Sequence, residues 1–315
     1  MKEIIDFSSC INLYQPEELV SVTNADISRY PDNSYEDFKE IIAKNYEINP
    51  NKIALFNGAT AGIYELFRKL KKKNIFLYAP LYGEYENAAI EAKKNIYLIN
   101  RITELEDEPN ENTIVVFVNP STPEGTYYDL EELMKTWMKL NCIIVLDESF
   151  LEFEELKSQR EKINTYKKLY IVQSFSSFYS SAGVRVGAIF SHEKNIKNLQ
   201  TQPWQVSSLD ESFLSLRLAD EAFKVQTREA HTKQKAELIS ILESSELFDE
   251  IVESDANFIL THSQNGEAIF KHLLEEKILV RTCGSFDYMS DDWLRFAVKD
   301  AVSQKKLAES LQNFQ

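Results

Sequence analysis

The stretch that decides the fold class runs over residues 113–147 and reads TIVVFVNPSTPEGTYYDLEELMKTWMKLNCIIVLD. It opens with the apolar run Ile114–Val118, continues through the amphipathic segment Leu130–Leu140, and closes with a second apolar run, Ile143–Leu146. Continuous runs rich in β-branched residues predict strands that are buried on both faces, whereas the 3.6-residue spacing between them predicts a helix. A strand, a helix and a strand in this order predict parallel strands joined by a crossover helix.

The same alternation continues on both sides of this unit. Further buried strands are predicted at Ile53–Phe56, Ile75–Tyr78, Ile96–Ile99, Leu169–Val172 and Val186–Phe190. Helical periodicity appears at Tyr35–Tyr46, Ala61–Leu70 and Glu84–Ala92. We therefore expect an α/β fold with three layers, in which helices cover both faces of a mainly parallel sheet.

The pattern changes after Trp204. Two long helices are expected, at Leu209–Ala222 and Thr227–Ser244, followed by a strand-helix-strand-strand-helix run from Ile251 to Leu311. This order predicts a smaller C-terminal α+β domain that is joined to the first by a long helix. We predict an N-terminal arm over residues 1–25, a large domain over 26–205, and the linking helix with the small domain over 206–315.

The composition excludes several classes of protein. The chain has 315 residues, 43% of them hydrophobic, and a formal net charge of −15, which disfavours binding to nucleic acid. Its three cysteines and four histidines show no metal-ligand or disulfide spacing, so no metal site is expected. No apolar run approaches the length of a membrane span, and the initial MKEIIDFSS lacks a signal sequence. We expect a soluble cytoplasmic protein without a membrane partner.

Polar residues follow three of the predicted strands, at the edge where ligands of open α/β sheets bind. The turn Asn57-Gly58-Ala59-Thr60 could present free N–H groups to a phosphate, or Thr60 could simply cap the next helix. Asp147 could hold a protonated ring nitrogen, or it could cap the segment after it. The hydroxyls of Ser174-Phe175-Ser176-Ser177 and the nearby Arg185 could form a phosphate cup, or this could be an ordinary turn.

Taken in order, these segments resemble the fold-type-I pyridoxal-phosphate enzymes, and among them the histidinol-phosphate aminotransferase and threonine-phosphate decarboxylase group. The resemblance covers nearly the whole chain. It is carried by Arg29-Tyr30-Pro31-Asp32, Asn57-Gly58-Ala59-Thr60, Ala79-Pro80-Leu81-Tyr82-Gly83-Glu84-Tyr85, Asn119-Pro120-Ser121-Thr122-Pro123-Glu124-Gly125, Asp147-Glu148-Ser149-Phe150 and Ala182-Gly183-Val184-Arg185-Val186-Gly187. The segments Asp6–Asn12, Gln202-Pro203-Trp204 and Leu279–Phe286 resemble the decarboxylase branch.

The resemblance implies pyridoxal 5'-phosphate as the cofactor and gives each matching residue a role. Asp147 would hold the pyridine nitrogen, Tyr82 would stack on the ring, and Thr122 and Phe150 would face the phenolic oxygen. The cofactor phosphate would lie against Ala59, Thr60, Ser174, Ser176 and Arg185. A small phosphorylated amino acid would be the substrate, bound by Asn12, Arg281 and Arg295. The family's homodimers imply that Tyr30 completes the site of a partner subunit.

Three positions depart from the family pattern. Ser177 stands eight residues before Arg185, where the family has the lysine that binds the cofactor. Thr122 replaces the asparagine that contacts the phenolic oxygen, and Phe150 replaces a tyrosine that many relatives direct to the same oxygen. The lysine both holds the cofactor and moves the proton of the substrate α-carbon, and a serine hydroxyl does neither at neutral pH.

Two explanations of Ser177 stay open. A serine engineered into an active enzyme would trap the bound substrate, and the retained Asp147, Arg185, Arg281 and Arg295 favour this explanation. Alternatively, the natural chain has lost the lysine, as the changes at Thr122 and Phe150 suggest. The first explanation predicts decarboxylation or transamination of a small phosphorylated amino acid once the lysine is restored. The second predicts a non-catalytic protein that binds a ligand or a partner on the same scaffold.

Overall fold

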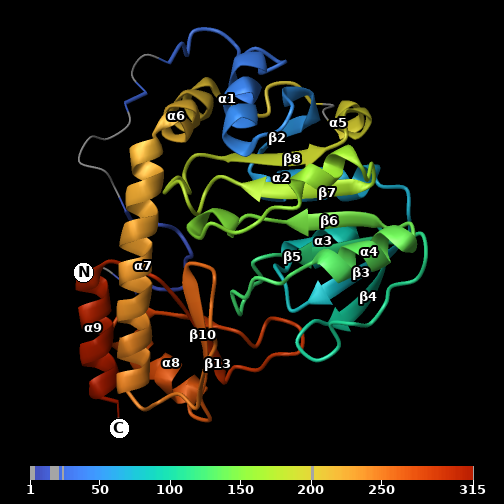
Figure 1. Cartoon of the computed structure of the whole chain (residues 1–315). Coiled ribbons are helices and arrows are strands. Elements are labelled where there is room, and N and C mark those ends of the chain that lie inside the picture. Colours follow the sequence, from blue (N-terminus) through green and yellow to red (C-terminus); the bar gives the residue numbers. More distant parts are fainter. Residues whose placement is uncertain (1–3, 15–20, 23–24, 200–201, 315) are drawn as a thin grey trace.

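A seven-stranded sheet forms the centre of the computed structural model, which describes residues 4–14, 21–22, 25–199 and 202–314 (Figure 1). Its strands lie in the order β2-β8-β7-β6-β5-β3-β4. Neighbours from β7 to β4 run parallel, whereas β8 is antiparallel to both β2 and β7. The mainly parallel sheet is therefore confirmed. The strands are β2 (Ile53–Asn57), β3 (Asn74–Ala79), β4 (Asn95–Asn100), β5 (Ile114–Val118), β6 (Ile143–Asp147), β7 (Leu169–Ser174) and β8 (Val186–Ser191).

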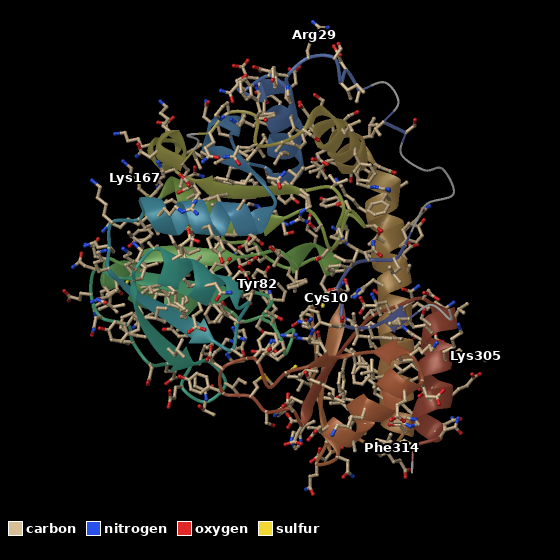
Figure 2. The ribbon with its side chains drawn as sticks, turned by 180° about the vertical axis from the view of Figure 1, so that it is seen from behind. Cys10, Arg29, Tyr82, Lys167, Lys305 and Phe314 are labelled. Carbon is tan, nitrogen blue, oxygen red and sulfur yellow. The ribbon has the colours of Figure 1, made fainter. Side chains whose placement is uncertain are left out.

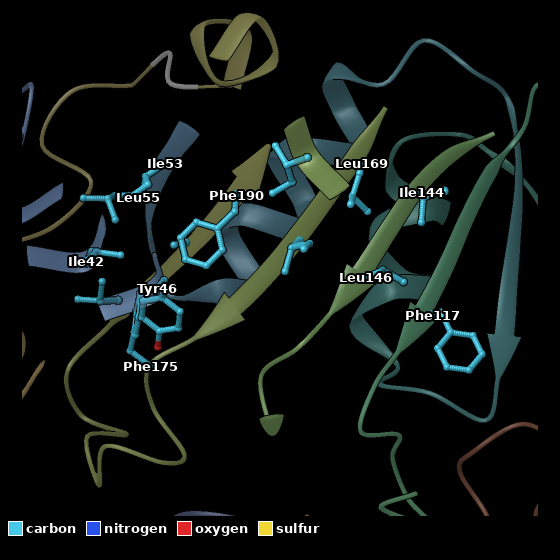
Figure 3. Packing of buried hydrophobic residues seen from close by; sticks show 14 of the residues in the cluster. Ile42, Tyr46, Ile53, Leu55, Phe117, Ile144, Leu146, Leu169, Phe175 and Phe190 are labelled. Carbon is cyan, nitrogen blue, oxygen red and sulfur yellow. The ribbon is translucent and has the colours of Figure 1, made fainter. Parts of the chain in front are cut away.

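Helices cover both faces of this sheet, as a continuous apolar strand requires. Successive side chains of a strand point to opposite faces, so Ile144 and Leu146 join one core cluster and Val145 joins the other. Figure 3 shows part of the first cluster. The helices on that face are α1 (Glu36–Tyr46), α4 (Glu131–Lys139) and α6 (Ser208–Ala219), and those on the other are α2 (Ala59–Lys69), α3 (Glu84–Glu91) and α5 (Glu193–Leu199). Short 3₁₀ turns occupy Pro50–Lys52, Leu151–Phe153 and Arg160–Asn164.

The long helix α7 (Glu221–Ser244) runs from the sheet to the C-terminal part of the chain (Figure 1). The predicted limits of this helix and of α6 were wrong, because α6 ends at Ala219 and α7 begins six residues before Thr227. The reason is Asp220, whose side chain accepts a hydrogen bond from the N–H of Phe223 and so caps α7. One aspartate thus breaks the two helices where the periodicity indicated a longer gap.

The C-terminal part is the predicted α+β arrangement. A four-stranded antiparallel sheet in the order β12-β13-β10-β9 packs with α7, α8 and α9 around a third core cluster. The elements are β9 (Glu250–Ile251), β10 (Phe258–His262), α8 (Gly266–Glu275), β11 (Ile278–Leu279), β12 (Arg281–Thr282), β13 (Trp293–Ala297) and α9 (Ala301–Gln312). The N-terminal arm joins this part, because β1 (Ile5–Asp6) pairs in parallel with β11. The domain limits at residues 25 and 205 stay predictions.

The loops that follow the parallel strands face this C-terminal part. The N–H of Asp255 donates to the carbonyl of Gly125 at 2.8 Å, and the carboxylate of Asp255 accepts from the N–H of Tyr127 at 2.8 Å. Figure 2 labels Tyr82 and Cys10, both toward the region where the two parts meet. A site built from these loops is therefore bounded on its other side by the N-terminal arm and β13.

In the part of the chain that the structure describes, no helix has both the length and the apolar character that crossing a membrane requires.

Candidate active site

The carboxyl ends of neighbouring strands bring most of the predicted site residues to one edge of the sheet. Gly58 follows β2, Tyr82 follows β3 and Thr122 follows β5, while Asp147 and Ser174 end β6 and β7. The prediction that these loops lie together at the carboxyl edge of the sheet is therefore confirmed. Their contacts form two ends of opposite character and a third group on the side of β13.

The first end is suited to an anion. Helix α2 begins at Ala59, and its N-cap is Gly58 (φ 82°). No side chain caps the helix, so its first backbone N–H groups donate to no capping side chain. The alternative in which Thr60 caps the helix is therefore wrong, because Thr60 lies inside it. A Cβ on Gly58 would approach Nη2 of Arg185 to 2.5 Å, so the guanidinium lies directly beside this helix terminus.

Two positive groups face each other at this end. The helix terminus carries partial positive charge, and Arg185 makes its hydrogen bonds to neutral groups, with Nη1 donating to the hydroxyl of Ser176 at 3.3 Å and the carbonyl of Ala182 at 3.0 Å. No carboxylate of the described residues forms an ion pair with Arg185. Thr60 lies here too, with its Oγ1 3.3 Å from the hydroxyl of Tyr82. The arrangement lacks only an anion that both positive groups can bind.

The second end is a buried carboxylate. Asp147 is 6% exposed; its Oδ1 accepts from the N–H and the hydroxyl of Ser149, and its Oδ2 accepts from the hydroxyl of Tyr85 at 2.7 Å. Burial raises the pKa of Asp147 despite these hydrogen bonds, and no basic side chain of the described residues lies close enough to lower it. A buried carboxylate without a cation fits a protonated ring nitrogen from a ligand. Its bond to the N–H of Ser149 confirms the local capping alternative, and the role of Asp147 toward a ring nitrogen stays a prediction.

A chain of hydrogen bonds connects the two ends. The hydroxyl of Ser149, which donates to Asp147, accepts from the N–H of Ser174 at 3.1 Å. The hydroxyl of Ser174 accepts from the N–H of Ser176 at 3.3 Å, and the hydroxyl of Ser176 accepts from Arg185. The carboxylate and the anion end are therefore parts of one frame. This serine run is more than an ordinary turn, because it fixes two charged groups relative to each other.

The third group contains the predicted substrate arginines. Nη1 of Arg295 donates to the hydroxyl of Thr122 at 2.9 Å, and Nη2 donates to the carbonyl of Ser8 at 3.2 Å. Its Nε is buried and has no partner among the described residues. Arg281 is the cross-strand partner of Arg295 and donates to the hydroxyl of Ser285 at 2.6 Å. Two guanidinium groups thus lie side by side, and the described residues pair neither with a carboxylate.

Aromatic rings complete this side of the site. The guanidinium of Arg295 lies 4.8 Å from the ring centroid of Phe258, and Phe150 meets Phe258 edge-on at 5.1 Å. Phe150 therefore contributes a ring and no hydrogen-bond donor. The hydroxyl of Thr122 accepts a hydrogen bond from Arg295, so it can still donate its single proton to another acceptor.

The turn that carries Ser177 is held by the N-terminal arm. The carbonyl of Ser177 accepts from the N–H of Asn12 at 2.9 Å, and the side-chain amide of Asn12 donates to the carbonyl of Phe178 at 2.9 Å. Asn12, predicted to bind substrate, thus uses its amide to position this turn. The Ser177 side chain is half-buried, and its hydroxyl has no hydrogen-bond partner among the described residues.

Tyr30 is the predicted residue that the structure does not bring to these loops. Its ring stacks on Trp204 with centroids 4.5 Å apart, and 78% of the residue is exposed. The ring contact given for Tyr30 among the described residues is with Trp204, which is not one of the predicted site residues. Its assignment to a partner's site stays a prediction.

A buried ion pair that was not predicted from the sequence lies beneath the site. Arg101 and Glu124 meet at 2.7 Å, with side chains 0% and 6% exposed. Nη2 of Arg101 also donates to the carbonyls of Pro80 and Thr122, so one side chain joins the loop that carries Tyr82 to the turn that carries Thr122. A glutamate within the otherwise uncharged turn 119–125 was the available signal, since such a charge needs a partner when it is buried.

The chain is similar in sequence to proteins of known families. A profile of the family described as aminotransferase class I and II matches residues 2–314. The chain is 28% identical over 304 residues to the histidinol-phosphate aminotransferase of Francisella philomiragia subsp. philomiragia, covering 90% of this chain and 83% of the relative. It is 29% identical over 331 residues to a putative threonine-phosphate decarboxylase of Caldanaerobacter subterraneus subsp. tengcongensis, covering 96% and 88%.

Solved structures share the fold. The histidinol-phosphate aminotransferase from Clostridium acetobutylicum superposes with a TM-score of 0.85 at 24% identity, covering 98% of both chains. The histidinol-phosphate aminotransferase from Sinorhizobium meliloti, solved in complex with pyridoxal-5'-phosphate, superposes with a TM-score of 0.82 at 17% identity, covering 92% of this chain and 84% of that one. At these identities the likeness concerns the fold alone.

Proposed function

Because this chain belongs to the aminotransferase class I and II family, we propose that it binds pyridoxal 5'-phosphate together with a small phosphorylated amino acid, in a site of the threonine-phosphate decarboxylase or histidinol-phosphate aminotransferase type. The observation that carries this proposal is the unbalanced charge of the two linked ends. Asp147 is a buried carboxylate without a cation, and Arg185 is a cation beside a helix terminus without an anion.

Pyridoxal 5'-phosphate supplies both missing charges on one planar ring. Its protonated pyridine nitrogen would face Asp147, its phosphate would lie between Arg185 and the N-terminus of α2, and Tyr82 would cover one face of the ring. When bound, the ring draws electrons from the α-carbon of an attached amino acid. The residues of this chain would hold the ring nitrogen charged, fix the phosphate, and orient the ring through the serine chain that links Asp147 to Arg185.

The substrate class follows from the two arginines. Arg281 and Arg295 are cross-strand neighbours without carboxylate partners among the described residues, so a ligand with two anionic groups would balance them. An amino acid with a carboxylate and a phosphate has this charge pattern. Arg295 is held by Thr122 and Ser8 and would take the carboxylate, while the more exposed Arg281 would take the second anion.

A second candidate function is ligand binding without turnover. It is favoured by Ser177, because no amine stands at that position to bond the cofactor or to move the α-proton. Loss of a single proton-transfer group costs about 10²–10⁴-fold in rate, and here the attachment of the cofactor is lost as well. Both candidate functions involve the same ligands in the same binding site. Only a measurement of turnover distinguishes them.

We also propose a homodimer. Tyr30 exposes 78% of its surface and stacks on Trp204, which is itself 50% exposed. Ile27, three residues earlier in the chain, is 75% exposed. Large apolar side chains exposed in this way are typical of a surface that a partner covers. The family resemblance would direct Tyr30 to the phosphate of the partner's cofactor.

The test restores the amine. Ser177→Lys should bind pyridoxal phosphate covalently and should turn over phosphothreonine, phosphoserine or histidinol phosphate if the chain derives from a working enzyme. The double variant Ser177→Lys/Arg295→Met keeps the cofactor contacts and loses the carboxylate contact, so it is the control and should raise the KM for phosphothreonine and phosphoserine. It should leave the KM for histidinol phosphate, which has no carboxylate, much less affected. A lysine variant that binds the cofactor and turns over none of these substrates would establish the second candidate. Failure of the parent and the lysine variant to bind any pyridine phosphate would overturn the proposed function.

A further inference from the structure

The two charged ends of the site fit pyridoxal phosphate, but the position of its aldehyde does not. Ser177 offers a hydroxyl that has no hydrogen-bond partner among the described residues, in the place where the family has an amine. A serine side chain ends one atom beyond Cβ and a lysine side chain ends four atoms beyond it. The aldehyde would therefore have no amine to bond with at this position.

Three lysines of the described residues, Lys167, Lys168 and Lys299, do not fill this place. Lys167 and Lys168 precede β7, whose six residues separate them from the Ser177 turn by about 20 Å at the rise of an extended strand. Figure 2 labels Lys167 at the outer margin of the molecule and Tyr82 near its middle. Lys299 is buried, but its Nζ donates to the carbonyl of Ser9 at 2.7 Å and is held on the arm.

The phenolic side of the ring has fewer donors than the family pattern gives it. Phe150 packs edge-on against Phe258 and cannot donate, so the hydroxyl of Thr122, which accepts from Arg295, is left to donate its single proton. The amine form of the cofactor would supply a second donor, because its 4'-ammonium group lies next to the phenolic oxygen. The aldehyde form would place a second acceptor there.

From these three departures we infer that the site takes pyridoxamine 5'-phosphate, the amine form, as a reversible ligand in preference to pyridoxal 5'-phosphate. The inference rests on the proposed function and adds which form is bound. Both forms share the contacts with Asp147, Arg185 and the N-terminus of α2. In a site with a lysine the aldehyde gains a covalent bond that the amine cannot make, and Ser177 removes that advantage.

Electrostatics act in the same direction. The amine form carries an ammonium group where the aldehyde form is neutral, so it can make a charge-assisted hydrogen bond at this place. The hydroxyl of Ser177 is an acceptor on this side, and a bridging water would span the difference in length between a serine and a lysine side chain. The ligand's own nitrogen would thereby take the place of the missing lysine nitrogen.

The experiment is a pair of calorimetric titrations of the full chain, in a buffer free of primary amines and phosphate. We expect pyridoxamine phosphate to bind about tenfold more tightly than pyridoxal phosphate, which is the effect of one charge-assisted hydrogen bond. Ser177→Lys should reverse the order and should yield a borohydride-stable adduct with pyridoxal phosphate. A thermal melt of this variant shows that it is folded, so that a failure to reverse counts against the inference.

Asp147→Asn separates the two proposals. It should weaken both forms by a similar factor, because it acts at the end of the ring that they share. If the parent binds pyridoxal phosphate as tightly as the amine form or more tightly, and Asp147→Asn weakens both, the inference about the amine form fails and the proposed function stands. If neither form binds the parent, the proposed function fails with it.

Discussion

The substitution Glu124→Gln tests the buried ion pair beneath the site. It removes the charge that faces Arg101 while keeping the shape of the side chain. Arg101 would lose its charged partner at 2.8 Å from Nε and 2.7 Å from Nη2, in a place where its own side chain is 0% exposed. Breaking a buried pair from one side typically costs about 3–5 kcal/mol, because the remaining charge stays buried.

The structure places Glu124→Gln at the low end of this range and Arg101→Met at the high end. Without Glu124, the guanidinium keeps the carbonyls of Tyr78, Pro80 and Thr122 and lies 5.6 Å from the ring centroid of Phe117. Without Arg101, the carboxylate of Glu124 keeps the hydroxyl of Tyr128 at 3.3 Å, and its Oε2 has no partner among the described residues. We expect losses of about 3 and about 5 kcal/mol in the free energy of unfolding.

Urea denaturation measures both losses, and Glu131→Gln is the matched control. Glu131 pairs with Lys135 at 3.0 Å, but the two side chains are 64% and 59% exposed, so its loss should change the free energy of unfolding very little. The double variant Arg101→Met/Glu124→Leu should be more stable than either single charge-breaking variant, because no buried charge remains. If Glu124→Gln costs no more than the control, the interpretation of this pair as a buried clamp is wrong.

Three further predictions concern the site. Asp147→Asn should raise the stability of the ligand-free protein at pH 7, because burial raises the pKa of Asp147 in the folded state. Ionisation of Asp147 therefore reduces the stability of the parent as the pH rises from the ordinary pKa of 3.8 through the raised one. The gain of the variant over the parent should shrink on acidification, and thermal melts that show a loss at pH 7 would contradict this. Gly58→Ala should destabilise the protein by about 1 kcal/mol and weaken phosphate-bearing ligands, since φ is 82° and the new Cβ meets Arg185, whereas Gly83→Ala, with nothing within 4 Å, should change neither denaturation nor binding. Tyr30→Ala should weaken pyridine-phosphate binding with little effect on the melting temperature, and light scattering that shows a monomeric parent would refute the dimer on which this depends.

Patterns that depend on local burial could be predicted from the sequence. The strands of the large sheet are apolar at nearly every position because helices cover both faces, and runs such as Ile114–Val118 carry this signal without help from distant residues. The break between α6 and α7 could not be placed in the same way. It depends on one capping aspartate, Asp220, and no glycine or proline marks it.

The same distinction applies to the site, where some features could be predicted from the sequence and others could not. Residues that follow strands, such as Gly58 and Asp147, were placed correctly because the fold itself brings strand ends together. Contacts between distant segments could not be predicted from the sequence. Nothing in the local sequence pairs Arg101 with Glu124 or directs the amide of Asn12 to the carbonyl of Phe178. The linking role of Ser149 between Asp147 and Ser174 likewise depends on how β6 and β7 lie side by side.

The central claim is that this chain binds a pyridine 5'-phosphate through Asp147 and Arg185 without bonding it covalently. The most direct test is mass spectrometry of the intact parent chain after saturation with pyridoxal phosphate and reduction with borohydride, alongside Ser177→Lys. We predict an unmodified parent, although calorimetry shows the ligand bound, and a single covalent adduct on the lysine variant. A stoichiometric adduct on a native lysine of the parent would contradict the claim, because another amine would then be doing the work assigned to position 177.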